Sequence, residues 1–138
     1  MIREYTSIEQ LDSEVLFVIG FRKGQENPIG RWDLVRRIYG DEAVTEDTKN
    51  DNNSYDRAVR NSIQRLRKQG KHICSNSSGK GYYMAKTRDE YKKFKSSYLG
   101  ANYEKFEIVS AMDETADLEW GPEPKEPKPT PEGQMAFV

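Results

Sequence analysis

The side chains with the most evident chemistry lie between residues 55 and 70, where basic and amide groups recur at helical spacing. One narrow face of this predicted helix is apolar: Ala58, Val59, Ile63 and Leu66. The opposite face is polar and carries Arg57, Arg60, Asn61, Gln64, Arg65 and Lys68. In the major groove of B-DNA, arginine hydrogen-bonds guanine edges, and asparagine or glutamine hydrogen-bonds adenine edges. The residues of this face therefore predict hydrogen bonds to base edges. Its basic side chains would also displace counterions from DNA phosphates, which favours binding to any sequence.

The distribution of charge along the chain favours an anionic partner for the same segment. The net charge of the 138 residues is -1, but residues 1–55 have a balance of -4, residues 56–95 of +9 and residues 104–138 of -6. The acidic loop from Asp41 to Asp51 opposes this reading, because it would repel phosphates if it lay against DNA. Either that loop points away from the DNA, or the basic face binds a protein.

The elements that precede the basic helix are predicted from apolar spacing and capping residues. Apolar side chains at helical spacing predict a helix over residues 7–20, with Ser7 as its N-cap. Residues 28–30 should be extended, and residues 31–39 should form a short second helix that ends at Gly40. The loop 41–53 is rich in Asn, Asp and Thr, and Asn53 and Ser54 offer side-chain oxygens to cap the basic helix.

A β-hairpin should follow the basic helix. Residues 71–75 and 81–85 are two short strand-like runs, joined by the polar turn 76–80. Lys71 and Lys80 lie on this hairpin. His72 and Cys74 alternate onto one face of the first strand, and we expect that face to be packed.

The basic helix and the hairpin together resemble the winged-helix family, in its small phage and bacterial form. The residues that carry the resemblance are R-N-S-I-Q-R-L-R-K-Q-G at 60–70, I-C-S at 73–75 and G-K-G-Y-Y at 79–83; the clear part covers residues 54–86, about a quarter of the chain. The resemblance implies an α+β, mostly helical fold, in which residues 1–86 form a helix-strand-helix-helix-hairpin domain.

The function that this resemblance implies is the binding of double-stranded DNA. The recognition helix 54–70 would lie in the major groove, and the wing 71–85 would contact the DNA backbone. Lys71 and Lys80 lie on this wing, where members of the family commonly have residues that contact DNA. The protein would then be a phage-type transcriptional regulator or a replication accessory factor. The alternative is a winged helix that docks on or inhibits a host or phage protein without binding DNA, because the fold also serves as a protein-docking module.

A further helix is expected after the hairpin. Thr87 and Glu90 fit a capping box, and helical spacing continues past Gly100, which predicts one C-terminal helix over residues 87–116. Its stripe consists of Tyr91, Phe94, Tyr98, Phe106 and Met112. A lone extended helix must bury such a stripe, so we expect a homodimer through residues 91–112 and a two-fold DNA site.

The last segment, residues 117–138, reads as a disordered, acidic, proline-rich tail. It ends in an apolar peptide in which Gln134, Met135, Phe137 and Val138 resemble the Q-L-S/D-L-F peptide that docks bacterial proteins on the replicative sliding clamp. The clamp is therefore a candidate partner of this peptide, and the alternative is a frayed terminus.

Several function classes are disfavoured by counting. One cysteine and one histidine provide neither an internal disulfide nor a four-ligand zinc site. The turn at 79–81 lacks the spacing of a phosphate-binding loop, and no nucleophile, base and oxyanion donor converge. We therefore expect no metal, no cofactor and no enzyme activity. With no long apolar run and no secretory pattern at the N-terminus, a cytoplasmic protein of a bacterial host cell is expected.

Overall fold

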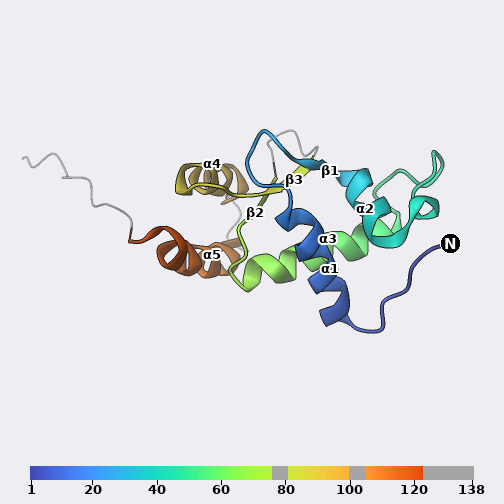
Figure 1. The fold of residues 1–138 in the computed structure, drawn as a ribbon, viewed down its shortest axis with the longest axis horizontal. Coiled ribbons are helices and arrows are strands. Elements are labelled where there is room, and N and C mark those ends of the chain that lie inside the picture. The colour runs from blue at the N-terminus through green and yellow to red at the C-terminus, as the bar shows by residue number, and fades with distance from the viewer. Residues whose placement is uncertain (76–80, 100–104, 123–138) are drawn as a thin grey trace, which may run out of the picture.

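The computed structural model describes residues 1–75, 81–99 and 105–122. In these ranges the chain is α+β and mostly helical, with five α-helices, one 3-10 helix and a three-stranded antiparallel sheet (Figure 1). The elements are, in chain order, α1 (Ile8–Gly20), β1 (Ile29–Gly30), α2 (Arg31–Tyr39), the 3-10 helix η1 (Asp41–Ala43), α3 (Ser54–Lys68), β2 (Ile73–Ser75), β3 (Gly81–Met84), α4 (Arg88–Leu99) and α5 (Phe106–Trp120).

The ends of the first three α-helices lie where local capping chemistry predicts them. The Ser7 hydroxyl accepts from the Gln10 amide at 3.1 Å, which caps α1. The Asn53 side chain accepts from two amides in the first turn of α3. Gly40 follows α2 with a φ of 111°, and its amide donates to the last turn of the helix. The predicted caps of α1 and α3 and the predicted end of α2 are confirmed.

The sheet has the strand order β1-β3-β2, so the central strand comes last in the chain. Strand β3 pairs with β2 in the predicted hairpin and with β1 on its other edge. A Cβ atom on Gly81 would lie 2.9 Å from the Ile29 carbonyl oxygen, so glycine is required where β1 approaches β3. The turn of the hairpin, residues 76–80, lies outside the described residues.

The two faces of the sheet cover two separate hydrophobic cores. Because side chains alternate along a strand, Ile73 packs into the core formed by α1, α2 and α3, whereas Cys74 packs into a second core with α4 and α5. Tyr82 and Tyr83 divide in the same way. The prediction that the His72 and Cys74 face is packed is confirmed, because both residues are buried.

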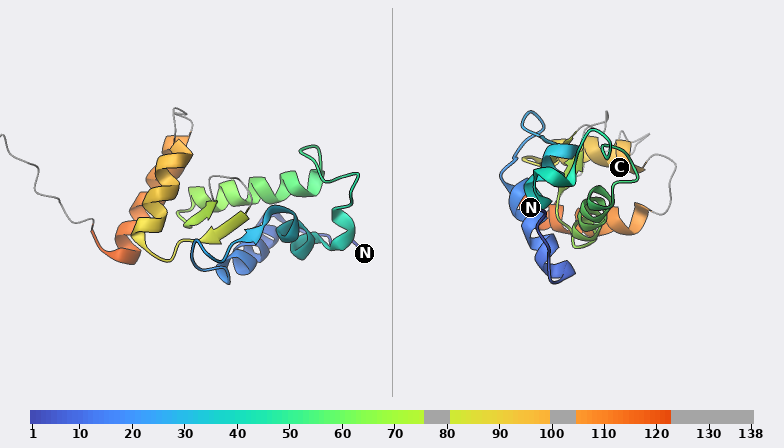
Figure 2. Two further views of the ribbon diagram at one scale, coloured as in Figure 1. Left: turned by 90° about the horizontal axis from the view of Figure 1, so that it is seen from above. Right: turned by 90° about the vertical axis from the view of Figure 1, so that its right-hand side faces the viewer.

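The predicted single C-terminal helix over residues 87–116 is wrong in its continuity. Helix α4 ends at Leu99, directly before Gly100, and α5 spans Phe106–Trp120. The predicted start of the tail at residue 117 is therefore wrong as well, because Trp120 packs against the second core; residues 123–138 of the predicted tail lie outside the described residues. The Tyr91 hydroxyl donates to Asp113 at 2.6 Å, which ties the two helices side by side. Figure 2 shows that they lie across the end of the molecule beside the C-terminal end of α3. Helical periodicity identified both segments but could not show that one folds back on the other.

This packing also removes the reason for expecting a dimer through residues 91–112. Tyr91, Phe94 and Met112 are buried in the second core, and Tyr98 packs against it. Phe106 is the member of the stripe that stays exposed among the described residues, at 51%. The aromatic stripe is therefore largely covered within one chain, and dimerisation no longer follows from it.

Candidate nucleic-acid interface

Helix α3 presents one face to the interior and the opposite face to solvent, as its sequence pattern predicts. Val59, Ile63 and Leu66 are each at most 2% exposed and pack against α1 and α2. The solvent side carries the predicted polar residues, five of them exposed and one half-buried: Arg57, Arg60, Asn61, Gln64, Lys68 and the half-buried Arg65. The structure therefore brings the six α3 residues predicted from the sequence onto one accessible side.

Four of these side chains form a straight stripe along the helix. Arg57, Asn61, Gln64 and Lys68 are spaced by four, three and four residues, which places them in one line spanning about 16 Å. Their side chains form no hydrogen bond or ion pair with any residue that the structure describes. We call these four residues the α3 stripe. Its donors and acceptors remain available to a ligand.

Arg60 and Arg65 differ from the α3 stripe because carboxylates hold them. At 3.6 residues per turn they lie roughly 70° to either side of the stripe. The Arg65 Nε and guanidinium NH2 groups donate to Asp12 of α1 at 3.0 and 2.8 Å. The Arg60 Nε donates to Asp56, one turn earlier in α3, at 2.8 Å. The stripe is thus flanked on both sides by positioned guanidinium groups.

Asp12 joins α1 to α3. Its carboxylate is almost buried and accepts from the Ser62 hydroxyl at 2.6 Å, in addition to its two bonds from Arg65. Burial by itself would raise the pKa of Asp12, but the hydrogen bonds from Arg65 and Ser62 outweigh that effect, so its pKa lies below the ordinary value. Asp12 is therefore ionised in the folded chain at neutral pH and locks the two helices together.

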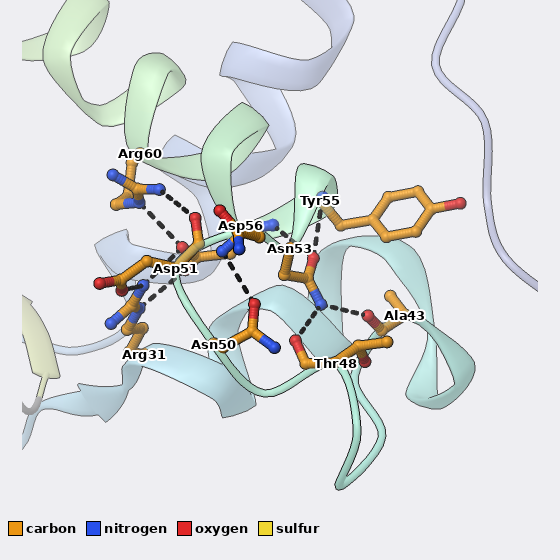
Figure 3. A network of polar contacts seen from close by, with 10 residues as sticks. Arg31, Ala43, Thr48, Asn50, Asp51, Asn53, Tyr55, Asp56 and Arg60 are labelled. Carbon is orange, nitrogen blue, oxygen red and sulfur yellow. Dashed lines mark hydrogen bonds and ion pairs between the residues drawn. The ribbon is translucent and has the colours of Figure 1, made fainter.

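Asp56 plays the corresponding part on the other flank, where two arginines converge on it (Figure 3). Arg31, at the start of α2, donates from Nε at 2.9 Å and from NH2 at 2.7 Å, so it grips both carboxylate oxygens. With Arg60 added, two guanidinium groups share one carboxylate that is 1% exposed. Burial would raise the pKa of Asp56, but the bonds from Arg31 and Arg60 bring it below the ordinary value.

The acidic loop before α3 is anchored to this same end of the helix. The Asn53 side-chain amide donates to the carbonyl oxygens of Ala43 at 2.8 Å and Thr48 at 2.9 Å, while its oxygen caps α3 (Figure 3). Asp51 accepts from Arg31 at 2.8 Å, and its side chain is 88% exposed. The loop therefore does not simply point away from the basic face, because one of its carboxylates lies beside it.

One basic residue of the segment is withdrawn from the surface. Arg67 is buried, donates from Nε to the Ile73 carbonyl at 2.8 Å, and lies over the rings of Phe94 and Tyr98. Burial lowers the pKa of its guanidinium. Arg67 therefore packs α3 against α4 and β2, and the balance of +9 overstates the charge that a ligand would meet.

Sequence reasoning missed the residues that position the interface, namely Asp12, Arg31, Asp56 and Ser62. A signal was present, because Asp12 lies next to Leu11 on the apolar side of α1, and Asp56 lies three residues before Val59. A charged residue on an apolar face indicates a buried partner. Nothing in the sequence identifies which of the 22 basic residues that partner is.

The remaining predicted site residues are only partly described. Lys71, two residues before the start of β2, is exposed. Lys80, in the hairpin turn, and the terminal peptide with Gln134, Met135, Phe137 and Val138 lie outside the described residues. Among the residues that are described, no three His, Cys, Asp or Glu side chains gather as metal ligands.

A pocket of about 620 Å³ lies away from the stripe, between the N-terminal segment and the start of α3. Tyr5, Tyr39 and Tyr55 contribute its aromatic lining. Over the described part of the chain, no helix is both long and apolar enough to cross a membrane.

Comparison of the chain with protein-family models, with curated proteins and with solved structures finds no match.

Proposed function

We propose that this chain is a winged-helix protein that binds double-stranded DNA, with α3 as the recognition helix and the β2-β3 hairpin as the wing. The chain order helix, strand, helix, helix, strand, strand agrees with what the resemblance of residues 54–86 implies. The antiparallel pairing of β2 with β3 agrees with the predicted wing.

The observation that carries the proposal is the α3 stripe between its two held arginines. The major groove of B-DNA is about 12 Å wide and admits one α-helix, whose exposed face then meets the base edges. Arg57, Asn61 and Gln64 offer the side-chain types that bond guanine and adenine edges. The four groups of the stripe bond to none of the residues that the structure describes, and held cations lie on both flanks, so the face offers base-reading and phosphate-binding groups together.

The flanking residues suit the sugar-phosphate backbone on either side of the groove. Arg60 and Arg65 keep 42% and 34% of their side chains exposed despite their bonds to Asp56 and Asp12. Phosphate contacts set the register of a protein on DNA, whereas base contacts set its sequence preference. In this proposal the α3 stripe reads bases, the two flanking arginines contact phosphates, and Lys71 at the start of the wing adds a further backbone contact.

Fluorescence anisotropy with a labelled random duplex, measured at salt concentrations from about 50 to about 200 mM, tests the proposal. We expect wild-type affinity to fall steeply with salt, and Arg57→Ala or Lys68→Ala to weaken binding about tenfold, because each variant removes a side chain that faces the groove. Lys93→Ala is the matched control, because Lys93 is exposed on α4 and removes the same charge away from α3.

Two results would contradict the proposal. Equal losses in Lys68→Ala and Lys93→Ala would show a general charge effect and no role for the α3 stripe. Absence of duplex binding at every salt concentration would favour the alternative, a winged helix that docks on another protein.

The amide side chains of the stripe allow a test of base reading without any change in charge. A preferred site is first selected with the wild-type protein from a pool of random duplexes. Asn61→Ala and Gln64→Ala should then lose about 5- to 100-fold in preference for that site over random duplex, while the salt slope stays unchanged. Unaltered preference in both variants would remove base reading from the proposal.

A further inference from the structure

One guanidinium nitrogen of Arg31 donates hydrogen bonds to two carboxylates that differ greatly in solvent exposure. Its NH2 group donates to Asp56 at 2.7 Å and to Asp51 at 2.8 Å (Figure 3). The Asp56 side chain is 1% exposed and the Asp51 side chain is 88% exposed. One partner of Arg31 is therefore built into the protein interior, and the other lies in solvent on the acidic loop.

Arg60 approaches the same place from α3. Its Nε donates to Asp56 at 2.8 Å, and its NH2 group lies 3.4 Å from the Asp51 backbone carbonyl oxygen. Two guanidinium groups thus face one buried carboxylate, which leaves one positive charge uncompensated. Asp51 supplies the missing negative charge from outside.

An exposed ion pair of this kind contributes little to stability and is easily exchanged. A phosphate oxygen offers a guanidinium the same type of acceptor as a carboxylate oxygen and commonly binds arginine through charge-assisted hydrogen bonds. The buried Asp56 cannot be exchanged in this way, because removal would leave two cations without their common partner. Asp51 is therefore the replaceable ligand of the Arg31-Arg60 pair.

The location of the pair points to the kind of anion that would replace Asp51. Arg60 lies on one flank of the α3 stripe, and Arg57 of the stripe is three residues before it on the same helix. A DNA duplex whose major groove holds the stripe would bring a backbone phosphate to this flank. The Asp51 carboxylate, which accepts from Arg31, would compete with that phosphate for the same guanidinium group.

We propose that Arg31 and Arg60 form a binding site for a DNA backbone phosphate and that Asp51 occupies this site in the free protein, so that the acidic loop competes with DNA. The inference rests on the proposed DNA binding. It explains why an acidic loop can lie beside a DNA-binding face: the loop lowers the affinity for any duplex and is displaced when the helix enters the groove.

The test compares Asp51→Asn with Asp47→Asn in duplex binding. Asp47 lies on the same loop, is exposed, and its side chain forms no bond with a described residue, so both variants lose one charge from one loop. We expect Asp51→Asn to bind random duplex about 3- to 10-fold more tightly than wild type with a steeper salt dependence, and Asp47→Asn to change affinity less than about twofold. Equal effects of the two variants would overturn the inference.

A second variant shows whether the gain passes through the arginines. In an Arg60→Gln background, Asp51→Asn should lose most of its gain, because the phosphate site is already incomplete. Arg60→Gln leaves Arg31 bound to Asp56, and its folding is checked by thermal unfolding. A gain that persists in full in this background would assign it to general electrostatics and overturn the inference.

A titration with dimethyl phosphate, followed by NMR of the arginine Nε-H groups, separates this inference from the proposed function. In Asp51→Asn, but not in Asp47→Asn, the signals of Arg31 and Arg60 should shift and saturate. If no variant binds duplex, the proposed DNA binding fails, while a saturating shift still supports an anion site at this pair. No shift in Asp51→Asn would overturn the site whether or not duplex binds.

Discussion

On each flank of α3 a largely buried aspartate binds arginine, but the two flanks differ in the number of guanidinium groups that share the carboxylate. On one flank Asp12 binds one guanidinium, Arg65, and completes its shell with the Ser62 hydroxyl. On the other flank Asp56 binds two guanidinium groups, Arg31 and Arg60, which leaves a positive charge that an exposed loop residue offsets. The first is a closed lock between helices. The Asp56 flank keeps one positive charge that Asp56 does not neutralise, which suits a site that exchanges one anion for another.

The largest expected effect that tests this comparison is on stability. Asp56→Ala removes the common partner of two arginines and should lower the free energy of unfolding by about 2–4 kcal/mol, whereas Asp12→Ala should cost about 1–3 kcal/mol. These values are set below those of fully buried pairs because the arginines retain solvent contact. Urea unfolding followed by circular dichroism measures both. A larger loss in Asp12→Ala would show that the number of shared arginines does not govern the strength of the lock.

A smaller effect should separate the flanks in DNA binding. Arg60→Ala should weaken duplex binding by about 3- to 10-fold and reduce the salt slope by about 0.9, because Arg60 contributes to the exchangeable site. Arg65→Ala should weaken binding less, because Asp12 already satisfies Arg65. Anisotropy titrations at several salt concentrations compare the two, with Lys93→Ala as the control for charge. Equal losses would mean that Arg65, which is bound to Asp12, contacts phosphate as strongly as Arg60 does.

The smallest expected difference is in the response to acid. Both Asp12 and Asp56 have a lowered pKa in the folded chain, so each contributes stability that is complete above the ordinary aspartate value of about 4 and is lost as the pH falls through the folded pKa. The unfolding free energy of the wild type should therefore fall on acidification below about pH 4 more steeply than that of Asp12→Asn. Parallel curves for the two proteins would remove Asp12 from the acid response.

Most of the helix and strand boundaries could be predicted from the sequence because local chemistry sets them. Ser7 and Asn53 cap their helices with their own side chains, and Gly40 ends α2. The separation of α4 from α5 could not be predicted in this way. It depends on contacts such as that of Tyr91 with Asp113, 22 residues apart, whose energy no local pattern contains.

The candidate interface divides along the same line. Helical periodicity by itself determined which face of α3 is exposed, and it placed the basic and amide groups there, because burial of Val59 and Ile63 forces the opposite face outward. The tertiary structure alone decided what each of these cations does. Arg67 is buried beneath α4, Arg65 is locked by a carboxylate from α1, and Arg60 shares Asp56 with Arg31 of α2. An ion pair forms only where the fold brings two charges within a few ångströms. The sequence therefore gives the number of basic side chains, whereas the tertiary structure determines which of them remain available to a ligand.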